Sequence, residues 1–136
     1  MTICLSLPMP ISTNALYANV PGKGRVKTKK YRAWIKAADA AYLIQKRVQK
    51  PVLDNFIAHI ILDDGKRAGD IDNRAKAVLD RLVSCGLIID DRHCNLITIE
   101  WGKRVTINWD KIHVDVEHVP SDCRVYVWPA EGEPMQ

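Results

Sequence analysis

An alternating apolar stretch in the middle of the chain limits the fold more than any other feature. Between Val52 and Leu62, apolar residues at even positions alternate with a second set that includes Ile57 and Ile61. A strand that faces solvent on one side carries polar residues at every second position, whereas a strand with two apolar faces is covered on both. The pattern therefore predicts a central strand with structure packed on both faces.

Helical spacing on either side of this strand predicts two amphipathic helices. The first runs over about residues 28–49, with Thr28 as its cap and Pro51 beyond its end. The second runs over about residues 70–85, and Gly86 is placed to end it in a left-handed conformation. Apolar residues recur along each segment at intervals of three and four, which gives each helix one buried face.

Shorter alternating runs predict the remaining strands. Residues 3–7 open the chain as a strand, and residues 12–24 are rich in turn formers and are predicted as a long loop. Strands are expected over residues 96–101 and 112–117, and residues 123–128 are expected to add an edge strand. The order β-α-β-α-β-β predicts a two-layer α+β domain with two helices packed on a mixed β-sheet.

Composition is that of a folded protein without a membrane span. The 136 residues suit a single domain, with 47% hydrophobic and 26% charged residues. No apolar run reaches the roughly 18 residues of a membrane span, and the N-terminus lacks a secretory pattern, so we expect a cytoplasmic protein with no membrane partner. The four cysteines form no C-x-x-C pair and are expected to pack as reduced thiols.

Charge is divided unevenly along the chain. The first 38 residues contain seven Lys or Arg and no acidic residue, whereas seven of the sixteen acidic residues lie between Asp63 and Asp91. A basic segment together with an acidic cluster is what a metal-dependent enzyme acting on a polyanion requires. Two solvated faces of opposite sign would give the same pattern, so composition alone leaves both interpretations open.

Three aspartates form the most informative pattern. Asp70 and Asp72 begin the second predicted helix with one residue between them, and Asp91 follows that helix after a short apolar run. Mg²⁺ prefers hard oxygen ligands and usually keeps several waters, so two or three aspartates with room for a phosphate oxygen suit it. Lys76 is four residues after Asp72 and shares its helix face, where its ammonium could neutralise charge on a scissile phosphate. Asn73 is placed to orient a water or a ligand carboxylate.

Geometry and ordinary structural roles both weigh against this interpretation. A helix of about 15 residues is roughly 22 Å long, whereas the five residues 86–90 span at most about 17 Å. The three carboxylates therefore meet only if the helix is short or bent, or if a second subunit completes the site. Acids in a first helical turn, an i,i+4 ion pair and an Asp-Asp turn also occur for purely structural reasons.

A set of motifs in a fixed order resembles a known family. They are Leu7-Pro8-Met9-Pro10 through Asn14 and Tyr17, then Tyr31-Arg32, and above all Asp70-x-Asp72-Asn73-x-x-Lys76 followed by Gly86 and Asp90-Asp91. Over about residues 2–119 the chain resembles the RusA family of Holliday-junction resolvases, which are small endonucleases of bacteria and their prophages. The resemblance makes residues 1–128 a single RusA-like nuclease domain, and residues 129–136 are expected to be a frayed tail.

The resemblance implies a specific chemistry. Asp70, Asp72 and Asp91 would be the acidic Mg²⁺-binding residues, with Mn²⁺ able to substitute, and Lys76 would be a catalytic lysine. Such enzymes act as homodimers on four-way junction DNA in recombination and repair, where they make two symmetric nicks. We therefore expect a crossover junction endodeoxyribonuclease of bacterial or phage origin.

Basic residues outside the aspartate cluster are expected to contact DNA phosphates. These residues are Lys23, Arg25, Lys27, Lys29, Lys30, Arg32, Lys66 and Arg67. Two other functions stay open at this stage. One is a non-catalytic junction-binding or DNA-architectural protein of the same fold, and the other is a metal-dependent nuclease for flaps or RNA.

Overall fold

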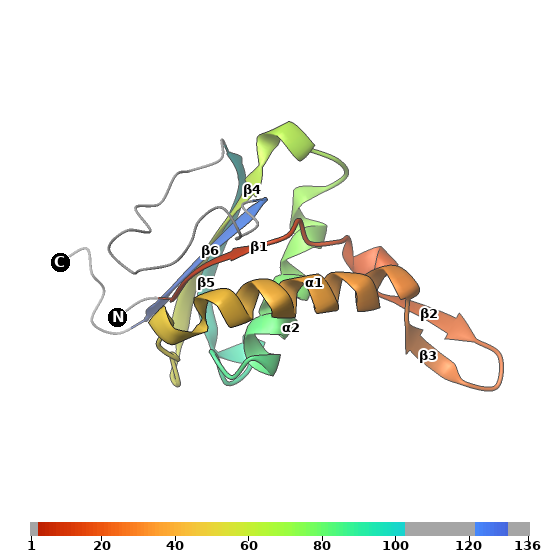
Figure 1. The fold of residues 1–136 in the computed structure, drawn as a ribbon, viewed down its shortest axis with the longest axis horizontal. Coiled ribbons are helices and arrows are strands. Elements are labelled where there is room, and N and C mark those ends of the chain that lie inside the picture. Colours follow the sequence, from red (N-terminus) through yellow and green to blue (C-terminus); the bar gives the residue numbers. More distant parts are fainter. Residues whose placement is uncertain (1–2, 103–121, 131–136) are drawn as a thin grey trace.

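The computed structural model describes residues 3–102 and 122–130, which form a four-stranded sheet, a separate two-stranded sheet and two α-helices (Figure 1). The main sheet contains β1 (Ile3–Leu7), β4 (Phe56–Asp63), β5 (Cys94–Gly102) and β6 (Cys123–Pro129). Their order is β1-β6-β4-β5, with β6 antiparallel to both neighbours and β4 parallel to β5. Helices α1 (Lys29–Gln45) and α2 (Ala75–Ser84) lie on one side of this mixed sheet, which confirms the α+β class.

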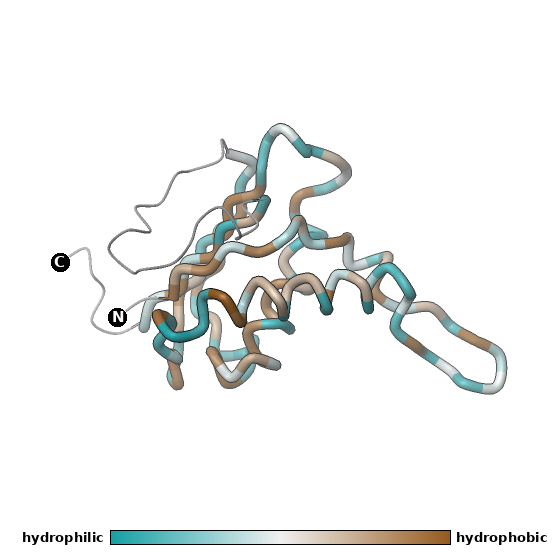
Figure 2. The backbone as a smooth tube through the Cα atoms, in the orientation of Figure 1, coloured by the Kyte–Doolittle hydropathy of each residue, from teal (hydrophilic) through white to brown (hydrophobic). Residues whose placement is uncertain are grey.

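Alternate side chains of β4 form the centre of the core. Phe56, Ala58, Ile60 and Leu62 are fully buried, and β4 lies between β6 and β5, so the predicted central strand is confirmed. Full burial of such a side chain stabilises the fold by about 1.5–3 kcal/mol. Figure 2 shows hydrophobic colours along the strands of the main sheet. The neighbouring strands and α2 contribute Ile3, Leu5, Leu7, Cys123, Val125, Val127, Ala77, Val78 and Leu82.

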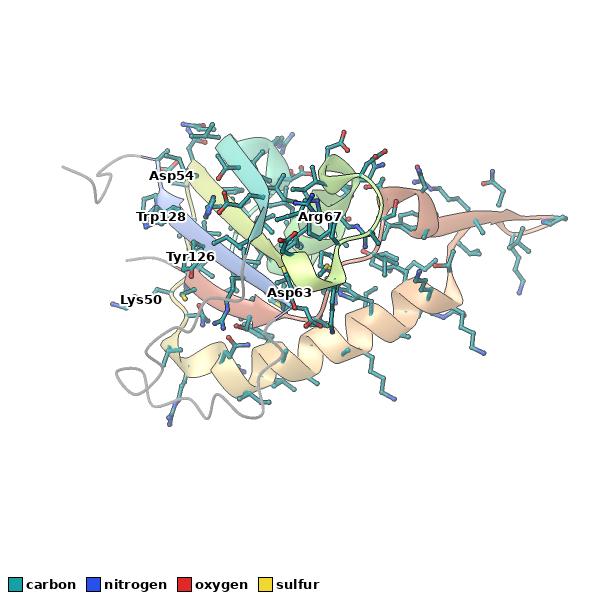
Figure 3. All side chains as sticks on the ribbon, turned by 90° about the horizontal axis from the view of Figure 1, so that it is seen from above. Lys50, Asp54, Asp63, Arg67, Tyr126 and Trp128 are labelled. Atoms are coloured by element: carbon teal, nitrogen blue, oxygen red, sulfur yellow. The ribbon has the colours of Figure 1, made fainter. Side chains whose placement is uncertain are left out.

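The second face of β4 is only half-buried, where the sequence predicted cover on both faces. The His59 ring stacks on Tyr126 with 6.2 Å between centroids, and Tyr126 stacks on Trp128 at 6.1 Å. Figure 3 shows Tyr126 and Trp128 side by side along β6. His59 also hydrogen-bonds Thr98 and lies 3.6 Å from Glu100. Aromatic rings therefore shield this face in part, which explains the half-buried Ile57 and Ile61 beside them.

Both predicted helices form, and the second is shorter than expected. The Thr28 hydroxyl accepts a hydrogen bond from the Tyr31 N–H at 3.1 Å, so the predicted cap is confirmed. The chain over Ile71–Arg74 is a 3₁₀ turn, and the α-helix begins only at Ala75. Gly86 has a φ of 76°, which is the left-handed conformation expected after a helix end.

The segment predicted as a long loop contains a hairpin. After the short 3₁₀ turn Thr13–Ala15, strands β2 (Tyr17–Val20) and β3 (Gly24–Lys27) pair in antiparallel fashion. Gly22 has a φ of 79°, and the Lys23 N–H donates to the Val20 carbonyl at 3.0 Å to close the turn. The turn formers mark the centre of a hairpin, because each flanking strand is too short for its alternation to be recognised.

The strand at the end of the described chain is internal rather than at an edge. β6 pairs with β1 on one side and with β4 on the other, which corrects the predicted edge position. Its partners are distant in the sequence, so local spacing carries no information about them. The strand extends to Pro129, and the Ala130 N–H donates to the Asn55 carbonyl at 2.9 Å. The strand predicted over residues 112–117 and the tail from residue 131 lie outside the described residues.

Two glutamines of α1 and the turn after it cover the outer edge of β1. The Gln45 side chain accepts from the Ser6 N–H at 2.9 Å and donates to the Ser6 carbonyl at 2.8 Å. Gln49 makes the same pair with Cys4 at 3.0 and 2.8 Å. Each side-chain amide thus replaces the backbone of a neighbouring strand. An unpaired strand edge is a template for aggregation, so this arrangement both satisfies and protects it.

Substitution of Gln45 should measure how much its hydrogen bonds to the edge of β1 contribute to the free energy of unfolding. Gln45→Ala leaves a buried N–H and a buried carbonyl of Ser6 without partners, and we expect a loss of about 2–4 kcal/mol in the free energy of unfolding. Urea unfolding followed by circular dichroism measures the change. Lys36→Ala, at an exposed position of the same helix, is the matched control. Equal unfolding midpoints for the two variants would contradict the structural role given to Gln45.

Candidate functional site

A cavity of about 330 Å³ lies where α2, α1, the base of the hairpin and the turn before β5 meet. Its lining combines acids, bases and aromatic hydroxyls. The residues are Tyr17, Lys27, Tyr31, Lys76, Asp80, Arg81, Val83, Ser84, Asp90 and Asp91. Two of the four predicted catalytic residues, Lys76 and Asp91, are therefore brought together here, and they are joined by acids and a hairpin lysine.

Lys76 is held between two carboxylates. Its Nζ lies 3.1 Å from Oδ1 of Asp80 and 3.3 Å from Oδ2 of Asp91. The pKa of Lys76 is raised above its ordinary value, chiefly by the hydrogen bond to Asp80; partial burial opposes this, and the hydrogen bond to Asp91 adds to the rise. The ammonium is therefore fully charged at neutral pH, as a group that contacts a phosphate must be.

The short second helix brings Asp91 to Lys76. The α-helical part has ten residues, and the chain reverses at Gly86 to enter the 3₁₀ turn Asp91–His93. The neighbouring Asp90 caps this turn, since its Oδ1 accepts from the Arg92 N–H at 3.0 Å. That backbone hydrogen bond is the main cause of the lowered pKa of Asp90. The helix is shorter than the sequence predicted, and Asp91 reaches Lys76, but the short helix does not bring Asp91 together with both Asp70 and Asp72.

Asp70 and Asp72 lie in the segment that precedes α2, and both are exposed. Arg74 fixes this segment, because its Nη1 donates to the Pro10 carbonyl at 2.7 Å and its Nη2 to the Ala68 carbonyl at 2.6 Å. The Thr13 hydroxyl adds a hydrogen bond to the Asn73 carbonyl at 2.9 Å. The two aspartates are thus carried on a tethered 3₁₀ turn at the start of the helix that holds Lys76.

The donors are suited to magnesium, but one chain does not gather them. Carboxylate oxygens are the ligands that Mg²⁺ prefers, and Asp70, Asp72 and Asp91 supply them. Among residues 3–102 and 122–130, no group of three or more His, Cys, Asp or Glu side chains lies close enough to hold a metal ion. The structure therefore pairs Asp91 with Lys76 and does not bring Asp70, Asp72 and Asp91 together as one group.

The predicted DNA-contacting cations fall into two sets. The first set lies on and beside the hairpin, which projects from the body of the molecule (Figure 1). It consists of Lys23, Arg25, Lys27, Lys29, Lys30 and Arg32. Within it, the Arg25 guanidinium lies 4.3 Å from the Tyr17 ring centroid, and Arg32 donates to the Lys27 carbonyl at 2.7 Å. These two contacts orient the Arg25 and Arg32 guanidinium groups without an acidic partner.

The second set is paired with acids. Lys66 lies 3.0 Å from Asp122, and Arg67 lies 3.0 Å from Asp64 with its guanidinium 5.5 Å from the Trp101 ring centroid. Figure 3 shows Arg67 beside the end of β4. Because each of these cations already has an acidic partner, a DNA phosphate would have to compete for it. The hairpin set is therefore the stronger candidate for a phosphate-binding surface.

Sequence reasoning missed Asp80, Arg74 and the aromatic wall of the cavity. Asp80 follows Lys76 by four residues, so the spacing that linked Asp72 to Lys76 could have identified it. Tyr17 and Tyr31 belong to the motifs named above, but their place in the cavity and the contact of Arg74 with Pro10 could not be predicted, because residues 10, 17 and 31 are brought to α2 only by the tertiary fold.

No protein-family model and no curated protein sequence matches the chain. In the part of the chain that the structure describes, no helix is both long and apolar enough to cross a membrane. The resolvase interpretation therefore depends on the motifs and geometry given above.

Arg74→Lys should loosen the segment that carries Asp70 and Asp72. A lysine ammonium cannot bridge both carbonyls in the planar geometry of a guanidinium, so we expect local opening to become easier by about 1–2 kcal/mol. Hydrogen exchange of the amides in residues 68–73 measures this opening. Arg92→Lys is the control, because that side chain is 82% exposed. Unchanged exchange in Arg74→Lys would show that other contacts hold the segment.

Proposed function

We propose that this protein is a Mg²⁺-dependent, structure-selective DNA endonuclease that resolves four-way junctions by paired symmetric nicks. One observation carries the proposal: the charged Lys76 side chain lies against Asp91 in a cavity whose rim continues into a basic hairpin. Such a site places a fixed cation and a metal-binding acid beside a surface for a polyanion. The order of motifs shared with the RusA family supports the same activity.

Each residue has a separate role in this proposal. Asp70, Asp72 and Asp91 would hold Mg²⁺, with Mn²⁺ able to replace it, and the ion would supply Lewis-acid activation of the phosphodiester. Lys76 stabilises the negative charge that develops on the phosphate during cleavage. Lys27, at the base of the hairpin, lines the same cavity and orients the backbone of the strand that is cut.

A homodimer is part of the proposal for two reasons. Two symmetric nicks need two equivalent sites, which a two-fold dimer provides. The three aspartates also do not form a closed metal site within the described part of one chain, and a subunit interface is a place where carboxylates from separate segments can meet. The junction itself has approximate two-fold symmetry, so the symmetry of the protein would match that of its substrate.

Cleavage of a labelled four-way junction tests the activity directly. We expect paired symmetric nicks with Mg²⁺, none with EDTA, and none on a matched linear duplex. Asp70→Asn, Asp72→Asn and Asp91→Asn should each lower the cleavage rate by about 100-fold or more while junction binding persists.

The control for these variants is Asp54→Asn, an exposed carboxylate at the far end of the sheet in Figure 3. It should cut like the unmodified protein. Tight junction binding with no cleavage in Mg²⁺ or Mn²⁺ would favour the architectural function instead. Equal cutting of flaps or RNA would assign the site to another nuclease class.

The hairpin should account for much of the salt dependence of binding. Replacing Lys23, Arg25 and Lys27 by alanine removes up to three phosphate contacts, so the slope of log K against log salt should become shallower by about 2–3. Titration of the junction at several salt concentrations gives this slope. Alanine at Lys36, Lys46 and Lys50, three exposed cations on and after α1, is the matched control. A slope unchanged by the hairpin variant would locate the DNA surface elsewhere.

A further inference from the structure

We propose that Asp80 is a positioning residue that keeps the Lys76 ammonium in the cavity when the Asp91 carboxylate is engaged by a metal ion. The inference rests on the proposed function, since it assigns a role to Asp91 as a metal ligand. It adds a fourth acid, which the motif interpretation did not include, and it gives that acid a task different from metal binding.

The geometry points to Asp80 because Lys76 contacts two acids from separate elements. Asp80 lies on α2 itself, one helical turn beyond Lys76, and its Oδ1 is the closer partner at 3.1 Å. Asp91 belongs to the turn after the helix and is 3.3 Å away. An ion bound by Asp91 competes with the ammonium for the same carboxylate. Asp80 then remains as the anchor that keeps the ammonium from turning into solvent.

The position of Asp80 differs from that of an ordinary surface ion pair. Its side chain is 27% exposed, compared with 47% for Lys76, and it lines the cavity beside the buried Tyr31. The charge of Asp80 contributes to the raised pKa of Tyr31, after the larger effect of burial. The carboxylate therefore faces the inside of the site, where screening by water is weaker than at an open surface.

The neighbouring cation of the cavity, Arg81, pairs with groups other than Asp80. The neighbouring Arg81 directs its Nη1 to Asp39 on α1, at 3.0 and 3.2 Å from the two carboxylate oxygens. Its Nη2 donates to the Ser84 hydroxyl at 2.7 Å. Asp80 forms its ion pair with Lys76. The Asp39–Arg81 pair is thus a matched comparison, an ion pair that joins α2 to α1 and does not involve Lys76.

Nuclear magnetic resonance of the lysine side chain tests the positioning role without DNA. The two Hε protons of Lys76, assigned with Lys76→Arg, have different chemical shifts when the side chain is held. Their chemical shifts average to one value when the side chain rotates freely. With Mg²⁺ alone as the probe, we expect the protons to stay inequivalent in the unmodified protein and in Asp39→Asn. They should average in Asp80→Asn and recover in Asp80→Glu, which restores a carboxylate at i,i+4.

Cleavage kinetics give the second measurement. In single-turnover reactions, Asp80→Asn should lower the cleavage rate by about 10- to 100-fold with junction affinity unchanged, because the cation is misplaced rather than lost. Asp80→Glu should recover most of the rate, and Asp39→Asn should retain all of it. Unfolding midpoints of the variants separate this effect from a loss of stability.

The outcomes distinguish the two proposals. If Lys76 stays held in Asp80→Asn with Mg²⁺ present, the positioning role is overturned whatever the protein cleaves. If Lys76 is released in Asp80→Asn while the unmodified protein cuts no junction, the endonuclease proposal fails and the role of Asp80 in holding the ammonium stands. An equal fall in junction affinity and rate would make Asp80 a residue for substrate binding and would also overturn the inference.

Discussion

Two buried glutamine side chains join α1 to the outer edge of β1, and the placement of the candidate site depends on this contact. Residues two apart on a strand are separated by about 6.6 Å. Gln45 ends α1 and Gln49 follows the 3₁₀ turn Lys46–Val48, and this turn brings the two side chains to Ser6 and Cys4. Because the contact fixes α1 along the edge strand, the start of α1 and the hairpin before it are fixed beside α2, where Tyr31 lines the cavity.

The site combines opposite charges that the chain keeps apart in sequence. The basic hairpin and the start of α1 bring cations to one rim, while α2 and the turn after it bring Asp80 and Asp91 to the other. Positive and negative charge are in direct contact at Lys76, a cation that is held by two acids. A polyanion drawn to the hairpin would approach a site in which the positive charge is already oriented, so little reorganisation is needed during the reaction.

Local sequence patterns predicted the elements that are determined by interactions between residues close together in the chain. The buried alternation of β4, the Thr28 cap and the glycine that ends α2 were all identified from the sequence, because each depends on neighbours within a few residues. The hairpin was missed because its strands have four residues each. The internal position of β6 was missed because strand pairing depends on which distant apolar faces meet, and several arrangements bury the same residues equally well.

By itself, the sequence determined the fold class, the uneven distribution of charge and the motif that contains Asp70, Asp72, Lys76 and Asp91. These follow from residue type and spacing along one chain. Only the tertiary structure decided that Lys76 lies between Asp80 and Asp91, and that Arg74 holds the aspartate segment to Pro10. A side-chain hydrogen bond acts over about 3 Å, so partners from separate elements, such as Asp91 for Lys76 and Pro10 for Arg74, are set by the packing of whole elements, which the order of residues does not encode locally.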